Sequence, residues 1–207
     1  MGVRVPRHAF DKMVLLGKNY LEHAKELGDK VPPKPVLFMK PPSSAVAAGA
    51  QHETVQARLP ANRGVVHYEI EVLLRLDDDL EIDAVSLGLD LTLRDLQADL
   101  KANGWPWEIG KVFRDSAIIG PWVDLKQFPK YMEEEFVLKL DGQKVQHGKG
   151  NDMSMKPKQA LAYIKEHFPM CSGDVIFTGT PAGVGPVSDG QLAELSWGKK
   201  LQYKVQF

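Results

Sequence analysis

The clearest alternation of apolar and polar side chains in the chain runs from residue 65 to residue 76, read V-V-H-Y-E-I-E-V-L-L-R-L. Because successive side chains of a β-strand point to opposite faces, this pattern predicts one strand. One face is almost wholly apolar and carries Val66, Tyr68, Ile70, Val72 and Leu74. The opposite face carries two neighbouring carboxylates, Glu69 and Glu71, between His67 and Leu73. The sequence therefore places two acids on a strand that belongs to the core.

Shorter apolar runs predict further strands over residues 13–16, 36–39, 54–57, 85–91, 137–140, 143–146, 175–178 and 201–207. Asp141-Gly142 joins two of these runs, and this dipeptide favours the type I′ turn of a hairpin. Helical patterns cover residues 20–27, 93–103 and 156–167. In the second of these helices, leucines form one stripe, and Arg94, Gln97 and Lys101 form the other. Many strands with few helices predict an α+β fold that is mostly β, and no repeat or linker divides residues 1–207.

The overall charge excludes some classes of partner. The chain has 207 residues, 26 basic and 27 acidic, and its formal net charge is −1. No basic block is present, so we expect neither nucleic acid nor a membrane as a partner. Cys171 is the only cysteine, which excludes an intrachain disulfide and fits a reducing compartment. With no apolar signal core at the start, we expect a cytoplasmic protein, and we expect Cys171 to be a small buried apolar residue.

Two carboxylates side by side on a core strand need a physical reason. Their Cα atoms would lie about 6.6 Å apart, and if the tips approach to about 4 Å they repel by roughly 4 kcal/mol at an effective dielectric of 20. A lone E-x-E more often lines a solvated face. Here the opposite face is apolar, and a third carboxylate, Asp90, stands in the apolar segment G-L-D-L-T. Three acids from two strands predict a site for Mg²⁺ or Mn²⁺.

Three other residues have both an ordinary and a chemical interpretation. Lys111, in I-G-K-V-F, is ordinarily a surface lysine whose stem covers apolar residues, but beside a metal it would stabilise an oxyanion or donate a proton. His23 and Glu26 lie three residues apart on the first predicted helix. On the residues alone an exposed polar helix is favoured. The chemical alternative is a base and its orienting group, which together activate a water molecule.

The segment 179–186, read G-T-P-A-G-V-G-P, is rich in glycine and proline. It is not a nucleotide-binding P-loop, because no Lys-Ser or Lys-Thr follows. It is either a plain turn or a site in which backbone N–H groups and the Thr180 hydroxyl hold a carboxylate.

Six segments resemble the fumarylacetoacetate hydrolase superfamily, in the order that the family shows. They are G-K-N-Y-L-E-H-A-K-E, P-V-L-F-M-K-P, H-Y-E-I-E, L-D-L-T-L-R-D-L-Q, W-E-I-G-K-V-F and G-D-V-I-F-T-G-T-P-A-G-V-G-P. Together they cover about residues 14 to 187, and the chain is most similar to the small single-domain acylpyruvase and oxaloacetate decarboxylase branch. One departure is Gly150 in G-K-G-N-D-M, where the family has threonine, which would alter substrate fit.

The resemblance implies a mixed β-sandwich roll, a homodimer and one catalytic domain over residues 1–207, with residues 18–32 as a lid. It implies that the metal ligands are Glu69, Glu71 and Asp90, with Lys111 beside the metal. The catalytic dyad would be His23 and Glu26. The residues that contact substrate would be Arg94, Gln97 and Thr180.

A 2-oxo acid can chelate Mg²⁺ or Mn²⁺ through its carboxylate and carbonyl oxygens, which stabilises the enolate formed when the C3–C4 bond breaks. Oxaloacetate would then lose CO₂, whereas an acylpyruvate would be hydrolysed by water activated by Glu26 and His23. Two alternatives stay open. One keeps the enolate but cleaves nothing: keto–enol tautomerisation of oxaloacetate, or isomerisation or decarboxylation of a catechol-degradation intermediate. The other is a non-catalytic metal-binding β module.

Overall fold

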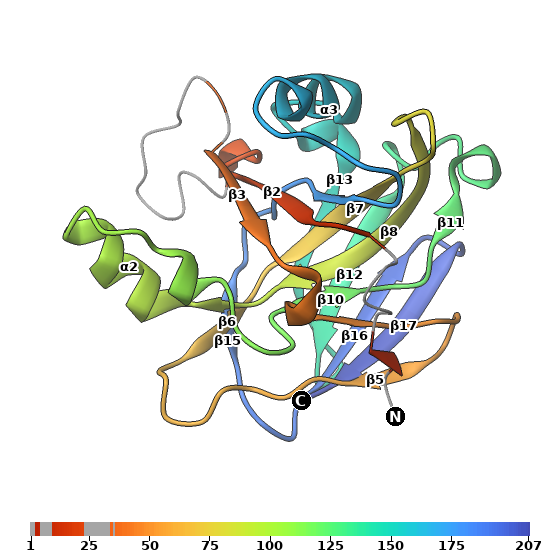
Figure 1. Cartoon of the computed structure of the whole chain (residues 1–207). Coiled ribbons are helices and arrows are strands. Elements are labelled where there is room, and N and C mark those ends of the chain that lie inside the picture. Colours follow the sequence, from red (N-terminus) through yellow and green to blue (C-terminus); the bar gives the residue numbers. More distant parts are fainter. Residues whose placement is uncertain (1–2, 5–9, 23–33, 35) are drawn as a thin grey trace.

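The computed structural model describes residues 3–4, 10–22, 34 and 36–207, and Figure 1 shows a body built mostly of strands. The strands are β1 (Val3–Arg4), β2 (Met13–Gly17), β3 (Val36–Lys40), β4 (Ala45–Ala47), β5 (Thr54–Gln56), β6 (Val66–Tyr68), β7 (Ile70–Leu76), β8 (Ile82–Asp90), β9 (Thr92–Leu93), β10 (Ala117–Ile119), β11 (Val123–Asp124), β12 (Glu135–Leu140), β13 (Gln143–Lys149), β14 (Val175–Phe177), β15 (Gly185–Val187), β16 (Leu192–Trp197) and β17 (Leu201–Gln206). The α-helices among the described residues are α2 (Arg94–Ala102) and α3 (Pro157–Lys165). Single 3₁₀ turns are η1 (Pro42–Ser44), η2 (Glu108–Gly110), η3 (Leu125–Gln127) and η4 (Gly150–Asp152).

The largest sheet has the strand order β1-β4-β10-β8-β7-β14-β2-β3, with β11 paired to β8. Its two longest strands, β7 and β8, run antiparallel and pair Glu71 with Gly88 and Ile70 with Leu89. Only glycine fits at position 88, because a Cβ atom there would lie 2.3 Å from the carbonyl oxygen of Ile118. This register carries Asp90, the last residue of β8, toward the two glutamates.

A second sheet, ordered β13-β12-β16-β17-β5, packs on one face of the first. Its hairpin confirms the predicted turn: Asp141 and Gly142 have φ angles of 49° and 81°, both in the left-handed region that a type I′ turn requires. Trp197 and Tyr203 are fully buried between the sheets. The Tyr203 hydroxyl donates a hydrogen bond to the carbonyl of Leu87 on β8 (3.1 Å), which ties the two sheets together.

The strand predicted over residues 65–76 is divided at Glu69. β6 joins a third sheet, ordered β15-β6-β9, and β7 continues in the largest sheet. The predicted alternation is nevertheless confirmed. The side chains that share the core cluster between the sheets include Val66, Tyr68, Ile70, Val72 and Leu74. Leu73 faces a separate cluster on the other side, together with Phe38 and Phe177. Glu71 has the same parity as Leu73, so its side chain lies on that second face.

The other predicted elements compare with the structure as follows. Strands occur in all eight predicted ranges, and α2 lies within the second helical range. α3 ends at Lys165, before the predicted residue 167. In the first range only residues 20–22 are described: Leu21 and Glu22 are helical, whereas Tyr20 forms an isolated β-bridge with Met153. β16 was not predicted, although it is the centre of the second sheet.

The prediction for Cys171 is wrong, because its side chain is exposed. Residue 171 lies in the surface turn before β14, and its backbone N–H donates to Oδ2 of Asp174 (2.8 Å). The buried carboxylate of Asp174 also accepts hydrogen bonds from the backbone N–H groups of Asp11 and Lys12. The turn is therefore held by backbone bonds to this carboxylate and needs no apolar side chain at residue 171.

Candidate functional site

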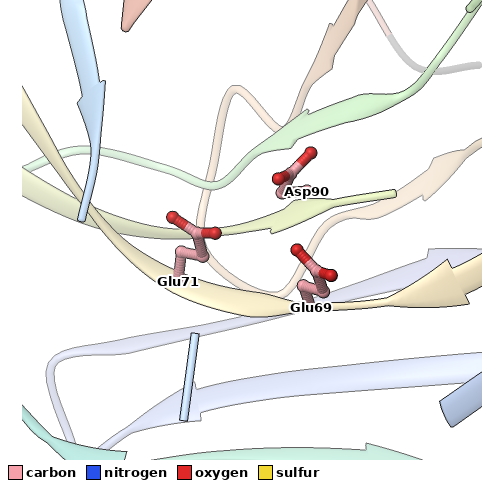
Figure 2. A group of neighbouring side chains, drawn as sticks. All are labelled: Glu69, Glu71 and Asp90. Carbon is pink, nitrogen blue, oxygen red and sulfur yellow. The ribbon is translucent and has the colours of Figure 1, made fainter. Parts of the chain in front are cut away.

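Three carboxylates meet at the end of the largest sheet where β7 begins and β8 ends. Glu69 lies at the break between β6 and β7, Glu71 lies on β7 and Asp90 ends β8. Figure 2 shows the three side chains gathered above these strands, and each offers an oxygen within 4.8 Å of the others. All three are buried, with exposed fractions of 5%, 3% and 1%. The structure thus brings together the three acids that were predicted from the sequence to be metal ligands.

The electrostatics of this cluster favour a cation. Burial raises the pKa of Glu71 well above its ordinary value, and the charges of Asp90 and Glu69 raise it further. The backbone N–H of Gly179, which donates to Oε2 of Glu71 (2.7 Å), opposes this shift. Three buried carboxylate oxygens form the hard donor set that Mg²⁺ and Mn²⁺ prefer, so these residues fit such an ion.

Lys111 belongs to the same cluster. Its side chain is 4% exposed, and Nζ donates to Oε2 of Glu69 (2.8 Å), Oδ2 of Asp90 (2.5 Å) and Oγ1 of Thr92 (2.7 Å). Burial alone would lower the pKa of this ammonium group, but the charges of Asp90 and Glu69 outweigh burial and raise the pKa. The ordinary interpretation as a surface lysine is therefore wrong, and Lys111 stays protonated beside the acids.

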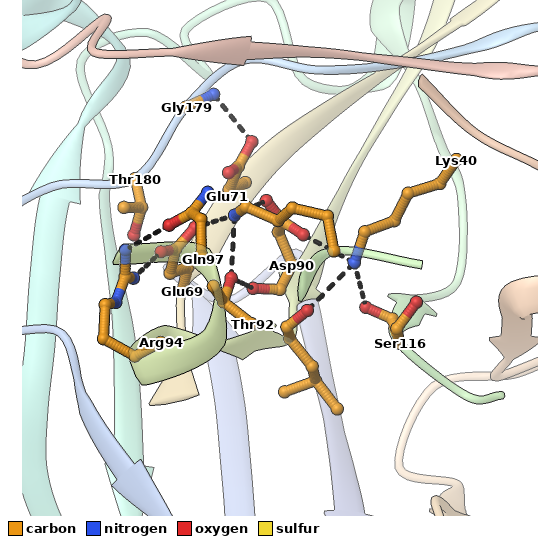
Figure 3. Close-up of polar contacts among 12 residues, drawn as sticks. Lys40, Glu69, Glu71, Asp90, Thr92, Arg94, Gln97, Ser116, Gly179 and Thr180 are labelled. Atoms are coloured by element: carbon orange, nitrogen blue, oxygen red, sulfur yellow. Dashed lines mark hydrogen bonds and ion pairs between the residues drawn. The ribbon is translucent and has the colours of Figure 1, made fainter. Parts of the chain in front are cut away.

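Lys40 is a second buried lysine at this site, and sequence reasoning gave it no role. It ends β3 and is 0% exposed. Figure 3 shows its Nζ atom paired with Oδ1 of Asp90 (2.6 Å) and donating to the carbonyl oxygen of Ser116 (2.6 Å). The same atom donates to the carbonyl oxygen of Leu91 (3.0 Å). Burial lowers the pKa of Lys40 to about 8, while the charge of Asp90 acts in the opposite direction. The sequence signal that could have revealed this role is that Lys40 lies two residues after Phe38, on the same face of a short apolar strand.

Arg94 and Gln97 lie on the first turns of α2, beside Glu69 (Figure 3). The Arg94 guanidinium forms an ion pair with Glu69, and its Nη1 donates to Oε1 of Gln97 (3.0 Å). Gln97 was predicted on the polar stripe of the helix, yet it is only 4% exposed. The reason is η2, which packs so closely that a Cβ atom on Gly110 would lie 3.1 Å from Cα of Gln97.

Thr180 lies in the loop that follows β14 and is 4% exposed. Its Oγ1 accepts a hydrogen bond from Nε2 of Gln146 (2.9 Å). Gln146 also donates to the carbonyl of Pro181 (2.9 Å) and accepts from the backbone N–H of Ile70 (2.9 Å). Sequence reasoning missed Gln146, which stands in a hairpin strand with no nearby motif. It ties the Thr180 loop to the strand that carries Glu71.

All the described residues that were predicted to act on metal or substrate line one cavity of about 410 Å³. The lining consists of Leu16, Gly17, Lys18, Val36, Phe38, Glu69, Glu71, Asp90, Arg94, Gln97, Ala98, Lys101, Trp107, Lys111 and Thr180. Gly150 is not among them. It packs on Met132, whose Sδ atom would lie 2.6 Å from a Cβ atom at residue 150. Residue 150 is therefore not in direct contact with the cavity in this structure.

The predicted dyad, His23 and Glu26, lies outside the described residues, as does most of the proposed lid over residues 18–32. Lys18 is described and lines the cavity, with a φ angle of 64°. No helix among the described residues has both the length and the apolar character that crossing a membrane requires.

Comparisons with known proteins identify the family of this chain. Residues 12–206 match the family described as fumarylacetoacetate (FAA) hydrolase C-terminal. A mitochondrial oxaloacetate tautomerase, FAHD2 of Oryza sativa subsp. japonica, is 37% identical over 193 residues, which cover 88% of this chain and 84% of that protein. A mitochondrial oxaloacetate decarboxylase of Dictyostelium discoideum is 34% identical over 191 residues and covers 87% of this chain and 86% of its own length.

A solved structure is also similar to this chain in fold and sequence. The fumarylpyruvate hydrolase of Pseudomonas aeruginosa, crystallised with Mn²⁺ and pyruvate, superposes with a TM-score of 0.87 and 30% identity. The match covers 95% of this chain and 89% of that one. The family match spans nearly the whole chain and agrees with the curled, mostly β fold. The chain therefore belongs to the fumarylacetoacetate hydrolase family, whose members include enzymes that act on oxo acids.

Proposed function

We propose that this protein is a Mg²⁺- or Mn²⁺-dependent enzyme that forms the enolate of small 2-oxo acids and cleaves their C3–C4 bond. The substrates would be acylpyruvates, which are hydrolysed, or oxaloacetate, which is decarboxylated. One observation carries the proposal: Glu69, Glu71 and Asp90 converge, with a protonated Lys111, in one cavity that Arg94, Gln97 and Thr180 also line. A non-catalytic metal-binding module needs no such buried lysine and no cavity.

Each residue has a role that follows from its place. Glu69, Glu71 and Asp90 would hold the divalent ion, which when bound supplies a Lewis acid for the two oxygens of the 2-oxo acid. The protonated ammonium of Lys111, beside these acids, would stabilise the negative charge that develops on the substrate oxygen. Arg94 and the Thr180 hydroxyl would hold the substrate carboxylate, and Gln97 orients Arg94 through their hydrogen bond. His23 and Glu26 stay the predicted pair that activates water for hydrolysis.

Tautomerisation of oxaloacetate is the second candidate, and the rice relative that bears this name supports it. It uses the same enolate but moves a proton between oxygen and carbon, and no carbon–carbon bond is broken. The fumarylpyruvate hydrolase neighbour, with its bound Mn²⁺ and pyruvate, supports cleavage. The same residues serve both reactions, so the product must be measured.

The test is to incubate the purified protein with Mg²⁺ or Mn²⁺ and either oxaloacetate or acetylpyruvate, following pyruvate with lactate dehydrogenase and NADH. Release of pyruvate, abolished by EDTA, supports cleavage. Faster decay of the oxaloacetate enol absorbance without pyruvate supports the tautomerase. If neither signal exceeds that of the uncatalysed reaction, the proposed function is wrong.

Two further expectations accompany the proposal. The homodimer and the cytoplasmic location remain predictions, and two of the relatives named above are mitochondrial. Gel filtration with light scattering tests the first, and localisation of the tagged protein in its own cells tests the second.

A further inference from the structure

The side chain of Gln146 is buried behind the cavity and is not among the residues that line it. Gln146 lies on β13 and is 1% exposed. Its Oε1 atom accepts a hydrogen bond from the backbone N–H of Ile70 (2.9 Å). Its Nε2 atom donates to Oγ1 of Thr180 (2.9 Å) and to the carbonyl oxygen of Pro181 (2.9 Å). One amide group therefore contacts both the start of β7 and the loop that follows β14.

Two backbone groups determine which end of this amide faces which partner. The N–H of Ile70 can only donate, so the amide oxygen must face it. The carbonyl of Pro181 can only accept, so the amide nitrogen must face the loop. A flipped amide would leave these buried groups unsatisfied, which costs free energy. The hydrogen bond between Gln146 and Thr180 thus has one direction, from the amide nitrogen to the hydroxyl oxygen.

This direction determines how the Thr180 hydroxyl can act. A threonine hydroxyl has one hydrogen to donate and lone pairs that accept. Because Oγ1 of Thr180 accepts from Gln146, its own hydrogen points away from Gln146. Thr180 lines the cavity together with Arg94, whose guanidinium has only donors. Two donors in one cavity suit an ionised carboxylate, since that group only accepts hydrogen bonds.

The loop of Thr180 also packs closely against β13. A Cβ atom on Gly183 would lie 2.5 Å from the carbonyl oxygen of Val145, the residue before Gln146. The other end of the Gln146 amide is held by Ile70, which lies between the two glutamates proposed as metal ligands. Gln146 therefore fixes the position of the Thr180 hydroxyl relative to the carboxylate cluster.

We propose that Gln146 is a positioning residue that holds the Thr180 hydroxyl as a hydrogen-bond donor to the carboxylate of the bound 2-oxo acid. Gln146 acts through Thr180 and does not itself touch the substrate. This inference rests on the proposed function, because that function places the substrate carboxylate at Arg94 and Thr180.

The test is a double-mutant cycle on pyruvate binding, measured by isothermal titration calorimetry with the Mn²⁺-loaded protein. Thr180→Val replaces the hydroxyl by a methyl group and should weaken binding about tenfold, the scale of a hydrogen bond to a charged group. Gln146→Met should weaken binding about fivefold, because the hydroxyl can then turn away from the ligand. In the Thr180→Val background, Gln146→Met should change the affinity by less than about twofold.

Two controls separate positioning from a loss of structure. Gln143→Met, on an exposed position of the same strand, should leave pyruvate affinity unchanged. A circular dichroism spectrum and a Mn²⁺ affinity like those of the wild type show that Gln146→Met is folded. Gln146→Leu takes its place in the cycle if Gln146→Met does not fold. Failure of both variants to fold would assign Gln146 to stability alone and overturn the inference.

Three other results would also overturn it. They are an unchanged pyruvate affinity in Thr180→Val, an unchanged affinity in folded Gln146→Met, and a loss from Gln146→Met that persists in the Thr180→Val background. A persistent loss is what a purely structural role predicts. If one of these results occurs while the wild type releases pyruvate from acetylpyruvate, only this inference fails. If the wild type binds no pyruvate and gives no pyruvate or enol signal, the proposed function fails as well.

Discussion

Nζ of Lys40 lies 2.6 Å from Oδ1 of Asp90, while Nζ of Lys111 holds Oδ2 of the same carboxylate. Asp90 is therefore clamped between two buried ammonium groups. Lys40 is in turn held by the carbonyl oxygens of Leu91 and Ser116, so it has little freedom to move. This arrangement makes Lys40 a positioning residue, since it holds one proposed metal ligand and does not itself line the cavity.

Lys40→Met should weaken Mn²⁺ binding about 10- to 100-fold, the range typical of residues that orient a metal ligand. Methionine fills most of the space of the lysine side chain but has no ammonium group to hold Asp90. Calorimetric titration with Mn²⁺ measures the effect, and a circular dichroism spectrum like that of the wild type shows that the variant is folded. Lys139→Met, on an exposed position of β12, is the control. Unchanged Mn²⁺ affinity in folded Lys40→Met would show that Asp90 needs no such support.

Glu71→Gln should abolish metal binding and turnover yet make the metal-free protein more stable at pH 8. The pKa of Glu71 is higher in the folded protein than in the unfolded chain, so the folded protein binds a proton more tightly there. The stability of the folded state therefore falls as the pH rises from the unfolded pKa, near 4.5, through the higher folded pKa. Glutamine removes that charge and can still accept the hydrogen bond from Gly179. We expect the melting temperature in EDTA to rise by a few degrees, about 2–4 °C for each kcal/mol in a domain of this size. A lower melting temperature would contradict the raised pKa.

The same pKa shift predicts a pH dependence of metal affinity in the wild type. A proton on Glu71 must leave before a divalent ion binds, so the metal-free state holds more protons than the metal-bound state. The affinity for Mg²⁺ should therefore rise with pH above the ordinary pKa of glutamate, 4.5. Titrations in two buffers of different ionisation enthalpy would detect the released proton. Equal heats in both buffers at a pH just above this value would contradict the raised pKa of Glu71.

Gly88→Ala should strongly destabilise the protein, because the new Cβ would lie 2.3 Å from the carbonyl oxygen of Ile118 and 2.7 Å from Cδ1 of Leu73. Overpacking a core typically costs about 1–3 kcal/mol, and a backbone contact of this kind lies at the upper end. Gly49→Ala is the matched control, since its nearest contact would be 3.7 Å from Oε2 of Glu53. Urea unfolding curves measure both. Equal midpoints for the two variants would refute the close packing of β10 and Leu73 around Gly88.

His23→Ala should reduce acetylpyruvate hydrolysis by about 100-fold or more, the usual scale for losing a general base. Decarboxylation of oxaloacetate should fall much less, because CO₂ leaves without an attacking water. The two rates are measured on one preparation with the pyruvate assay described above. Equal losses on both substrates would mean that His23 does not act on water.

The sequence by itself determined which residues alternate along each strand and where the turns lie. These features depend on neighbours within a few residues. The period of two therefore placed Glu69 and Glu71 on one face, and Asp141-Gly142 predicted its hairpin correctly. Segment 179–186 was predicted to be a loop rich in glycine and proline. Its last two residues, Gly185 and Pro186, instead belong to β15, which pairs with β6.

Only the tertiary structure decided which of these residues meet and which polar groups are buried. Lys111 reaches Asp90 across 21 residues, and Gln146 reaches Thr180 across 34 residues. Lys40 is fully buried while the neighbouring Met39 is 42% exposed, the reverse of what hydropathy predicts. The physical reason is that burying a charge costs much free energy unless partners neutralise it. Those partners come from strands that are distant along the chain, so the residues next to a buried lysine do not reveal them.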